Sequence, residues 1–130
     1  MTASLDPRRA LGERGERLAA THLERAGYTI LARNFRTRFG ELDLVAADNR
    51  CLIFCEVKTR IAGTRRGPAG PLDAIGPRKR AQVRAMAREW LASSASSDRP
   101  RRPELRFDAI GILVSRGGEL VSLDHVEDAF

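Results

Sequence analysis

The chain has 130 residues, a length that suits one domain with one modest core. Its 23 basic and 17 acidic residues give a formal net charge of +6, a balance that favours a polyanionic partner such as nucleic acid. No stretch approaches the roughly 20 consecutive apolar residues of a membrane span. Residues 1–17 also lack the apolar segment of a secretory signal. A cytoplasmic protein with no membrane partner is therefore expected.

The first half of the chain is predicted to form one helix and three strands. Apolar side chains at three- and four-residue spacings predict a helix over residues 11–26, and Gly27 is a plausible stop after it. Three strand-like segments follow, over residues 28–35, 40–47 and 50–58. Asp48 and Asn49 separate the last two and tolerate the left-handed conformations of a tight turn, which predicts a hairpin.

The second half is predicted to contain one helix and two strands between less regular segments. Apolar residues in register predict a helix over residues 78–92. Two strands follow, at residues 105–115 and 119–126. Residues 1–10, 61–77 and 93–104 are expected to be mobile, the middle segment being rich in Gly, Pro and Arg. This order predicts a single α/β domain over residues 1–130 with a mixed sheet.

The two cysteines are predicted to be buried apolar filler. Cys51 and Cys55 lie four residues apart in a predicted strand, so their Cα atoms would be about 13 Å apart. A disulfide requires a Cα separation below about 7 Å, so the two cannot pair with each other. They would share a face with Ile53 and Val57, which favours packing over metal binding.

The hairpin carries four charged residues at positions that place them together. If Asp48-Asn49 forms the turn, opposite residues have numbers that sum to 97, so Glu41 faces Glu56 and Asp43 faces Phe54. Because side chains alternate along a strand, one face then carries four charges: Glu41, Asp43, Glu56 and Lys58. The other face carries continuous core: Leu42, Leu44, Ile53, Cys55 and Val57.

Three neighbouring carboxylates repel one another and call for positive charge. Lys58 supplies part of it, and a hard divalent cation with oxygen ligands can supply the rest. Such a cation lowers the pKa of a bound water and neutralises charge on a phosphate, while a lysine orients the water or stabilises the transition state. The alternative is a set of exposed charges that protects an edge hairpin from pairing with other chains.

Lysine is rare in this basic chain. Among the 23 basic residues only Lys58 and Lys79 are lysines. A compact ammonium serves purposes that a guanidinium cannot, which suggests a specific role at position 58.

The charged hairpin resembles a nuclease signature. Asp43, followed after twelve residues by Glu56-Val57-Lys58, resembles the D…(D/E)xK signature of PD-(D/E)xK nucleases, although Leu42 stands where the classical proline would be. The wider context, over residues 12–130, resembles the YraN family of bacterial endonuclease-like proteins. The segments that carry this resemblance are "GERGERLAATHLERAGYTIL", "RNFRTRFGELDL", "LIFCEVKTR", "RFDAIGI" and "HVEDAF".

The resemblance implies a fold and a set of site residues. The fold is α/β with a restriction-endonuclease-like core, a mixed central sheet flanked by two main helices, similar to archaeal Holliday junction resolvases. It implies Asp43 and Glu56 as ligands of Mg²⁺ or Mn²⁺, the Val57 carbonyl as a further ligand, and Lys58 as the catalytic lysine. Glu16 on the first helix is the best match to the glutamate that completes the site in resolvase-like members. Glu41, in the family's GE-x-D pattern, is a further candidate metal ligand.

Other residues are candidates for nucleic-acid binding or for support. Basic residues in and around the Arg-rich segment could follow a DNA backbone or form a solvated surface: Arg60, Arg65, Arg66, Arg78, Lys79 and Arg80. Gln82 is a candidate supporting residue, and Asp108 either supports the site or has a structural role. His22 and His125 are expected to be structural.

Three functions are compatible with these observations. The leading hypothesis is a Mg²⁺- or Mn²⁺-dependent endodeoxyribonuclease, structure-directed and acting in DNA repair or recombination on branched or single-stranded DNA. The second is a catalytically silent DNA- or RNA-binding module on the same fold. The third is an accessory protein that contacts another protein in a DNA-processing complex. A homodimer is expected by analogy with the resolvases.

Overall fold

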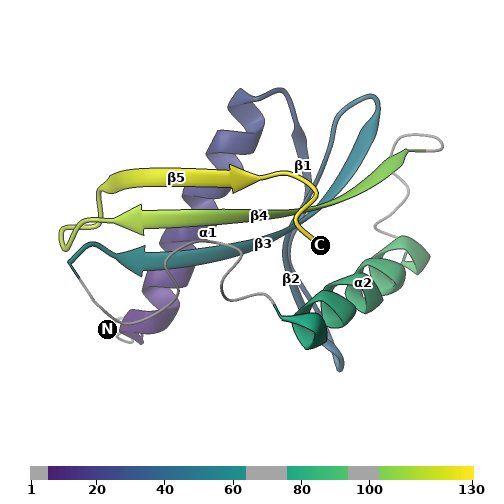
Figure 1. The fold of residues 1–130 in the computed structure, drawn as a ribbon, viewed down its shortest axis with the longest axis horizontal. Coiled ribbons are helices and arrows are strands. Elements are labelled where there is room, and N and C mark those ends of the chain that lie inside the picture. The colour runs from purple at the N-terminus through teal and green to yellow at the C-terminus, as the bar shows by residue number, and fades with distance from the viewer. Residues whose placement is uncertain (1–5, 64–75, 94–102) are drawn as a thin grey trace, which may run out of the picture.

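The computed structural model describes residues 6–63, 76–93 and 103–130, which form a mixed five-stranded sheet with a helix on each face (Figure 1). The α/β class and the expected order of elements are confirmed. The elements are α1 (Pro7–Arg25), β1 (Thr29–Thr37), β2 (Gly40–Ala47), β3 (Cys51–Ile61), α2 (Pro77–Ala92), β4 (Glu104–Val114) and β5 (Leu120–Val126). The predicted mobile segments lie largely outside the described residues. Arg65 and Arg66, two of the predicted DNA-binding residues, are also outside them.

The strands follow one another across the sheet in the order β1-β2-β3-β4-β5. The first three form an antiparallel meander, and β5 is antiparallel to β4. The pair β3–β4 is parallel, with Cys51 opposite Glu104 and Ile61 opposite Val114. A parallel pair needs a long crossover, and α2 lies in that crossover.

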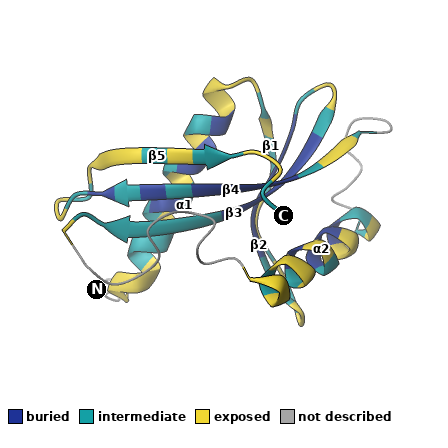
Figure 2. Ribbon diagram, in the orientation of Figure 1, coloured by how far each residue is buried: buried dark blue, intermediate teal, exposed yellow. Residues whose placement is uncertain are grey.

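Each helix buries an apolar stripe against one face of the sheet, and the buried positions follow the central strands (Figure 2). On one face, Ala19 and Leu23 of α1 pack in a cluster with Ile53 of β3 and Ile110 of β4. On the other face, Val83, Met86 and Trp90 of α2 pack in a cluster with Val45 and Phe54. The sheet is thus covered on both sides, and its central residues are buried.

Helix α1 begins at Pro7, four residues before its predicted start. Asp6 caps the helix, because its carboxylate accepts a hydrogen bond from the Arg8 N–H at 3.0 Å. Pro7 takes the first helical position, where its missing N–H costs nothing. Residues 7–10 are therefore the first turn of a helix, which corrects their prediction as part of a flexible N-terminus.

The register of the β2–β3 hairpin differs from the prediction by two residues. Leu44 pairs with Cys55 and Ala47 with Leu52, so opposite residues sum to 99. Asp48 causes the difference, because its carboxylate accepts hydrogen bonds from the N–H groups of Arg50 (2.8 Å) and Cys51 (2.6 Å). Asp48 therefore opens the turn, and Asn49 and Arg50 occupy its tip. A shift of two residues leaves each β3 side chain on its predicted face, since alternation has a period of two.

Cys55 is buried in the cluster under α1, and Cys51 packs against it from the rim. Both are free thiols on the face shared with Ile53 and Val57, as predicted, but only Cys55 is buried; Cys51 is half-buried, with its Sγ 3.8 Å from Glu104 Oε2. Among the described residues, neither helix is long and apolar enough to cross a membrane.

Candidate functional site

Strand β2 separates from β3 at Asp43. Backbone pairing between the two strands ends at Leu44, and the Asp43 carboxylate instead accepts a hydrogen bond from the Val57 N–H at 2.7 Å. The alternation of side chains also breaks here, because Leu42 packs in the α2 cluster and Leu44 in the α1 cluster. The prediction that Leu42 and Leu44 share a face was therefore wrong. The break turns a carboxylate into the interior, where Asp43 is only 5% exposed.

Glu56 lies next to Asp43 and is equally buried, with 4% of its surface exposed. One of its oxygens, Oε2, is buried and has no hydrogen-bond partner among the described residues. Burial and then the neighbouring Glu56 charge raise the pKa of Asp43 to about 8, against the opposing effect of the Val57 N–H. Two buried carboxylates in mutual repulsion thus form the centre of the site.

Two lysines contact the other oxygen of Glu56. Lys79 of α2 places its Nζ 3.1 Å from Glu56 Oε1, and Lys58 of β3 places its Nζ 3.7 Å from the same oxygen. The Lys58 side chain is 43% exposed and the Lys79 side chain 28% exposed. The ammonium groups therefore stand between the buried carboxylate and solvent.

Glu16 approaches from the opposite face, on α1. The helix comes close to β3 because Gly15 has no side chain; a Cβ there would collide with Thr59. Burial, and then the charge of Glu41, raise the pKa of Glu16, while a hydrogen bond with Asn34 lowers it. Like Glu56, Glu16 has a buried oxygen, Oε2, with no partner among the described residues. A cleft of about 210 Å³ adjoins this side chain, lined by Glu13, Glu16, Arg17, Arg33, Asn34 and Leu44.

Glu41 is placed differently from the other three carboxylates. Its side chain is 45% exposed and pairs with Arg36 of β1 at 3.2 Å. It acts on the site through its charge, which contributes to raising the pKa of Glu16 and of Asp43.

The chemistry of these residues fits a divalent cation. Within residues 6–63, 76–93 and 103–130 no three His, Cys, Asp or Glu side chains are arranged to hold a metal. Mg²⁺, however, typically takes one or two carboxylates and fills its remaining positions with water or phosphate oxygens. Asp43 and Glu56 supply that number, and the unpartnered Glu56 Oε2 and the charge repulsion at Asp43 are both features that a cation would relieve.

The predicted nucleic-acid-binding residues that the structure describes lie on α2 and β3, the elements that carry Lys79 and Glu56. Arg78 and Arg80 are exposed in the first turn of α2, and Arg60 lies on β3 two residues beyond Lys58. Gln82 donates a hydrogen bond to the Phe39 carbonyl at 2.8 Å, so it holds the turn between β1 and β2.

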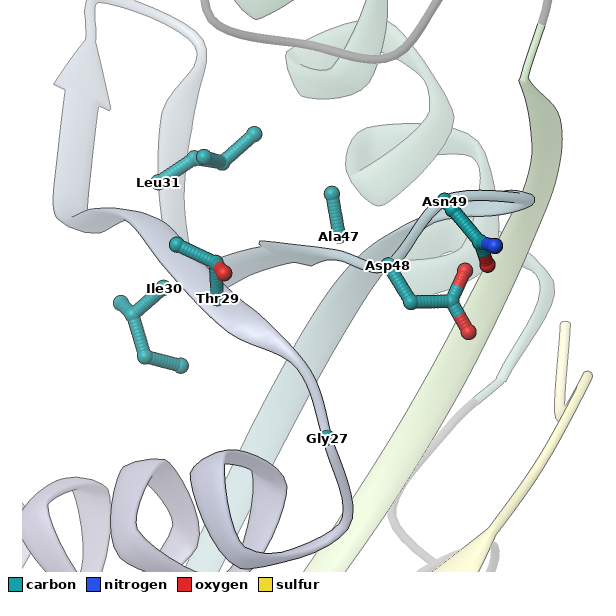
Figure 3. A pocket seen from close by; sticks show the side chains of 7 residues that line it. All are labelled: Gly27, Thr29, Ile30, Leu31, Ala47, Asp48 and Asn49. Atoms are coloured by element: carbon teal, nitrogen blue, oxygen red, sulfur yellow. The ribbon is translucent and has the colours of Figure 1, made fainter.

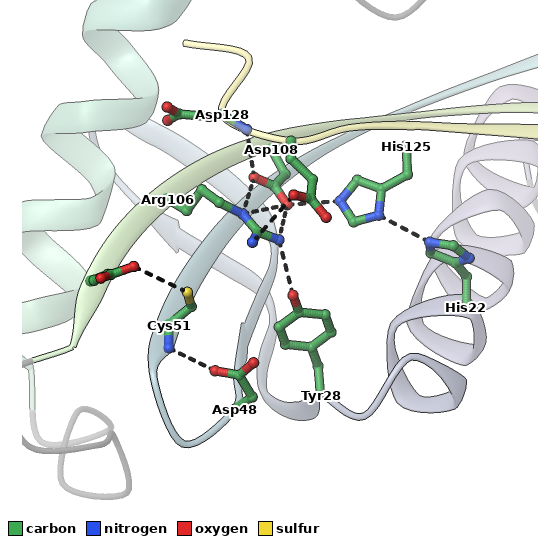
Figure 4. Close-up of polar contacts among 10 residues, drawn as sticks. His22, Tyr28, Asp48, Cys51, Arg106, Asp108, His125 and Asp128 are labelled. Carbon is green, nitrogen blue, oxygen red and sulfur yellow. Dashed lines mark hydrogen bonds and ion pairs between the residues drawn. The ribbon is translucent and has the colours of Figure 1, made fainter.

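Asp108 is the centre of a separate polar network on β4 (Figure 4). It is fully buried, pairs with Arg106 at 2.8 Å, and lies 2.7 Å from His125 Nε2. His125 in turn contacts His22 of α1 at 3.0 Å, and the Asp128 N–H donates to Asp108. Although burial acts to raise it, these hydrogen bonds keep the pKa of Asp108 below its usual value. The network ties α1, β4, β5 and the C-terminal residues together, which favours the structural alternative for Asp108.

A larger cleft, of about 680 Å³, opens beside the tip of the β2–β3 hairpin (Figure 3). It is lined by Gly27, Thr29, Ile30, Leu31, Ala47, Asp48 and Asn49. Asp48 is its single charged group, and that carboxylate already caps the hairpin turn. The cleft therefore adds no reactive group to the carboxylate centre.

Sequence reasoning missed two features of the centre. Asn34 hydrogen-bonds to Glu16 from a left-handed backbone conformation (φ 51°), which Asn adopts more readily than most residues. Lys79 was assigned only to a DNA-binding surface, although the rarity of lysine applies to it as much as to Lys58.

The fold and this centre define an α/β protein with a restriction-endonuclease-like core, in which two helices flank a mixed sheet. A family model described as "Uncharacterised protein family UPF0102" matches residues 15–112. A UPF0102 protein of Acidothermus cellulolyticus is 43% identical over 137 residues, with all of both chains covered. A second, from Frankia casuarinae, is 47% identical, with 93% of this chain and 96% of the relative covered. The chain therefore belongs to the UPF0102 family, which is the YraN family.

Proposed function

We propose that this protein is a metal-dependent endonuclease that hydrolyses DNA phosphodiester bonds, with structured DNA such as branched or single-stranded molecules as its substrate. The observation that carries the proposal is the pair of buried carboxylates, Asp43 and Glu56, with an unpartnered oxygen and a lysine beside them. Buried charges of like sign are costly, so an arrangement of this kind is typical of a functional site.

Asp43 and Glu56 would hold Mg²⁺ or Mn²⁺, with the Val57 carbonyl as a further ligand, and Glu16 would act on the site from α1 through its charge, which contributes to raising the pKa of Asp43. When bound, such a cation lowers the pKa of a water molecule and neutralises charge on a phosphate. Lys58 projects from the same strand as Glu56 and is partly exposed, so its ammonium can reach the phosphate and stabilise the charge that develops there. The exposed arginines of α2, Arg78 and Arg80, would hold the DNA backbone without reading its sequence.

The test is cleavage of labelled single-stranded DNA, duplex DNA, flaps and four-way junctions, with a structured RNA beside them, in Mg²⁺, Mn²⁺ or EDTA. Wild type is compared with Asp43→Asn, which keeps an acceptor for the Val57 N–H, and with Lys58→Met. Glu16→Gln is compared with Glu13→Gln, which removes an exposed carboxylate from the lining of the same cleft, one that pairs with Arg9.

We expect metal-dependent cleavage that Asp43→Asn and Lys58→Met each reduce by at least 100-fold, about 3 kcal/mol of transition-state stabilisation. Glu16→Gln should reduce cleavage more than Glu13→Gln does. Equal behaviour of all variants, whether active or inactive, would refute the assignment. Salt-dependent DNA binding that survives both substitutions without any cleavage would identify a silent binding module instead.

A further inference from the structure

The two lysines of the chain meet at one oxygen atom. They come from different elements, Lys58 from β3 and Lys79 from α2, and lie 21 positions apart in the sequence. All other basic residues of the chain are arginines. The position of both lysines at Glu56 Oε1 therefore indicates a shared requirement for an ammonium group.

The stability of α2 itself does not explain Lys79. The residue lies in the first turn of the helix, where the helix dipole disfavours a cation, and that turn contains no acidic residue. Gly76 at the N-cap provides no side-chain hydrogen bond either. The favourable interaction of Lys79 is thus outside its own helix, with Glu56, and it is the shorter of the two lysine contacts.

The contact of Lys79 with Glu56 also engages one of the two oxygens of a carboxylate that is proposed to hold a cation. Glu56 Oε1 carries both ammonium groups, whereas Oε2 has no partner in the described part of the chain. An ammonium is a compact point charge with a flexible stem, so it can neutralise a carboxylate and leave again. A guanidinium would form a two-pronged contact that is harder to displace.

We propose that Lys79 is a second lysine of the site: it neutralises Glu56 in the metal-free protein, and its ammonium moves to the phosphate of bound DNA once Glu56 is engaged by a divalent cation. The second half rests on the proposed function, and the first half does not. Lys79 would thereby offset the negative charge of the buried carboxylates before a metal ion binds, and would supply positive charge next to the scissile phosphate afterwards.

The experiment compares wild type with Lys79→Met, Lys79→Arg and Arg88→Met. Arg88 is exposed on the same helix and controls for the loss of one positive charge. Mn²⁺ affinity is measured on the DNA-free protein by titration calorimetry, and circular dichroism verifies that each variant is folded. Cleavage is then measured as separate kcat and KM values, with Mn²⁺ saturating for each variant.

We expect Lys79→Met to bind Mn²⁺ about tenfold more tightly, because a competing charge has been removed from Glu56. Lys79→Arg should bind it no more tightly than wild type, and Arg88→Met should equal wild type. With DNA, Lys79→Met should lower kcat at saturating Mn²⁺. Tighter metal binding combined with slower turnover is an outcome that loss of folding would not produce.

Unchanged or weaker Mn²⁺ binding by folded Lys79→Met overturns the proposal, as does the failure of both wild type and Lys79→Met to bind Mn²⁺. A raised KM with unchanged kcat also overturns it and makes Lys79 a residue that only anchors the DNA backbone. If wild type binds Mn²⁺ but cleaves no nucleic acid, the proposed function fails, while the affinity comparison still decides whether Lys79 neutralises Glu56.

Discussion

Replacing Asp43 with Asn should stabilise the metal-free protein at pH 8. The folded state holds this carboxyl at a pKa of about 8, because of burial and the neighbouring Glu56, whereas its ordinary value is 3.8. Between these values the folded protein keeps a proton that the unfolded chain has released, so stability falls as the pH rises from about 4 to about 8. The asparagine removes the charge and keeps an acceptor for the Val57 N–H.

The expected size follows from the two pKa values. A difference of this extent corresponds to an upper limit of about 5 kcal/mol at pH 8, since each pKa unit is worth about 1.4 kcal/mol. Relaxation and the two nearby ammonium groups reduce the effect, so a gain of about 2 to 3 kcal/mol is expected. Asp43→Ala should gain less, because the buried Val57 N–H then loses its partner at a cost of about 1–3 kcal/mol.

The assay is urea unfolding in EDTA, followed by circular dichroism at pH 8 and at pH 4. Asp124→Asn on β5 makes the same charge change at an exposed position and should stay within about 0.5 kcal/mol of wild type. The advantage of Asp43→Asn should shrink towards zero at pH 4, where wild type carries a protonated carboxyl. No advantage at pH 8, or the same advantage at both pH values, would refute the reasoning.

Three further predictions concern metal, acid and one turn. Mg²⁺ should raise the Tm of wild type more at pH 8 than at pH 6, because the Asp43 carboxyl, with its raised pKa, must lose its proton to bind the cation, and Asp43→Asn should show no such rise in thermal unfolding. Burial and then the charge of His125 lower the pKa of His22, so the neutral imidazole contributes stability above pH 6.5, and this contribution is lost as the pH falls below that value. In urea unfolding, His22→Gln should therefore lose less stability than wild type between pH 7.5 and pH 5.5. An equal loss in the two proteins would contradict this. Gly40→Ala should lower the free energy of unfolding by about 1–3 kcal/mol, because Gly40 has φ 139° and a Cβ would collide with the Gln82 side chain. A loss below about 0.5 kcal/mol in the same assay would contradict backbone strain at this position.

The spacing of apolar residues was sufficient to predict the helices and strands. The prediction failed for the register of the β2–β3 hairpin, which a single turn residue decides. The apolar stripes of the two helices and the alternation of the strands appear directly in the sequence, so their existence and order could be predicted. The hairpin register could not, because it depends on whether Asp48 opens the turn or occupies its tip. That choice moves the pairing of β2 against β3 by two residues.

Parts of the site depend on tertiary packing that no local pattern encodes. Asp43, Glu56 and Lys58 come from one hairpin, so their proximity could be inferred from alternation along the strands. Lys79 reaches Glu56 only because α2 packs on the sheet face that carries Val45 and Phe54, and this placement depends on how the apolar stripe of α2 packs. The network around Asp108 likewise joins residues as far apart in sequence as His22 and His125.

The parallel pairing at the centre of the sheet has a consequence for how the chain folds. Strands β3 and β4 meet at Cys51 and Glu104, which are 53 residues apart in the sequence, so a long loop must close before the central ladder can form. During synthesis α1 and the hairpin emerge first, while the β4 residues that contribute to the core under α1 emerge only after α2. The β3 edge is thus open to pairing with other chains for most of translation, and folding is expected to be limited by this late, non-local step.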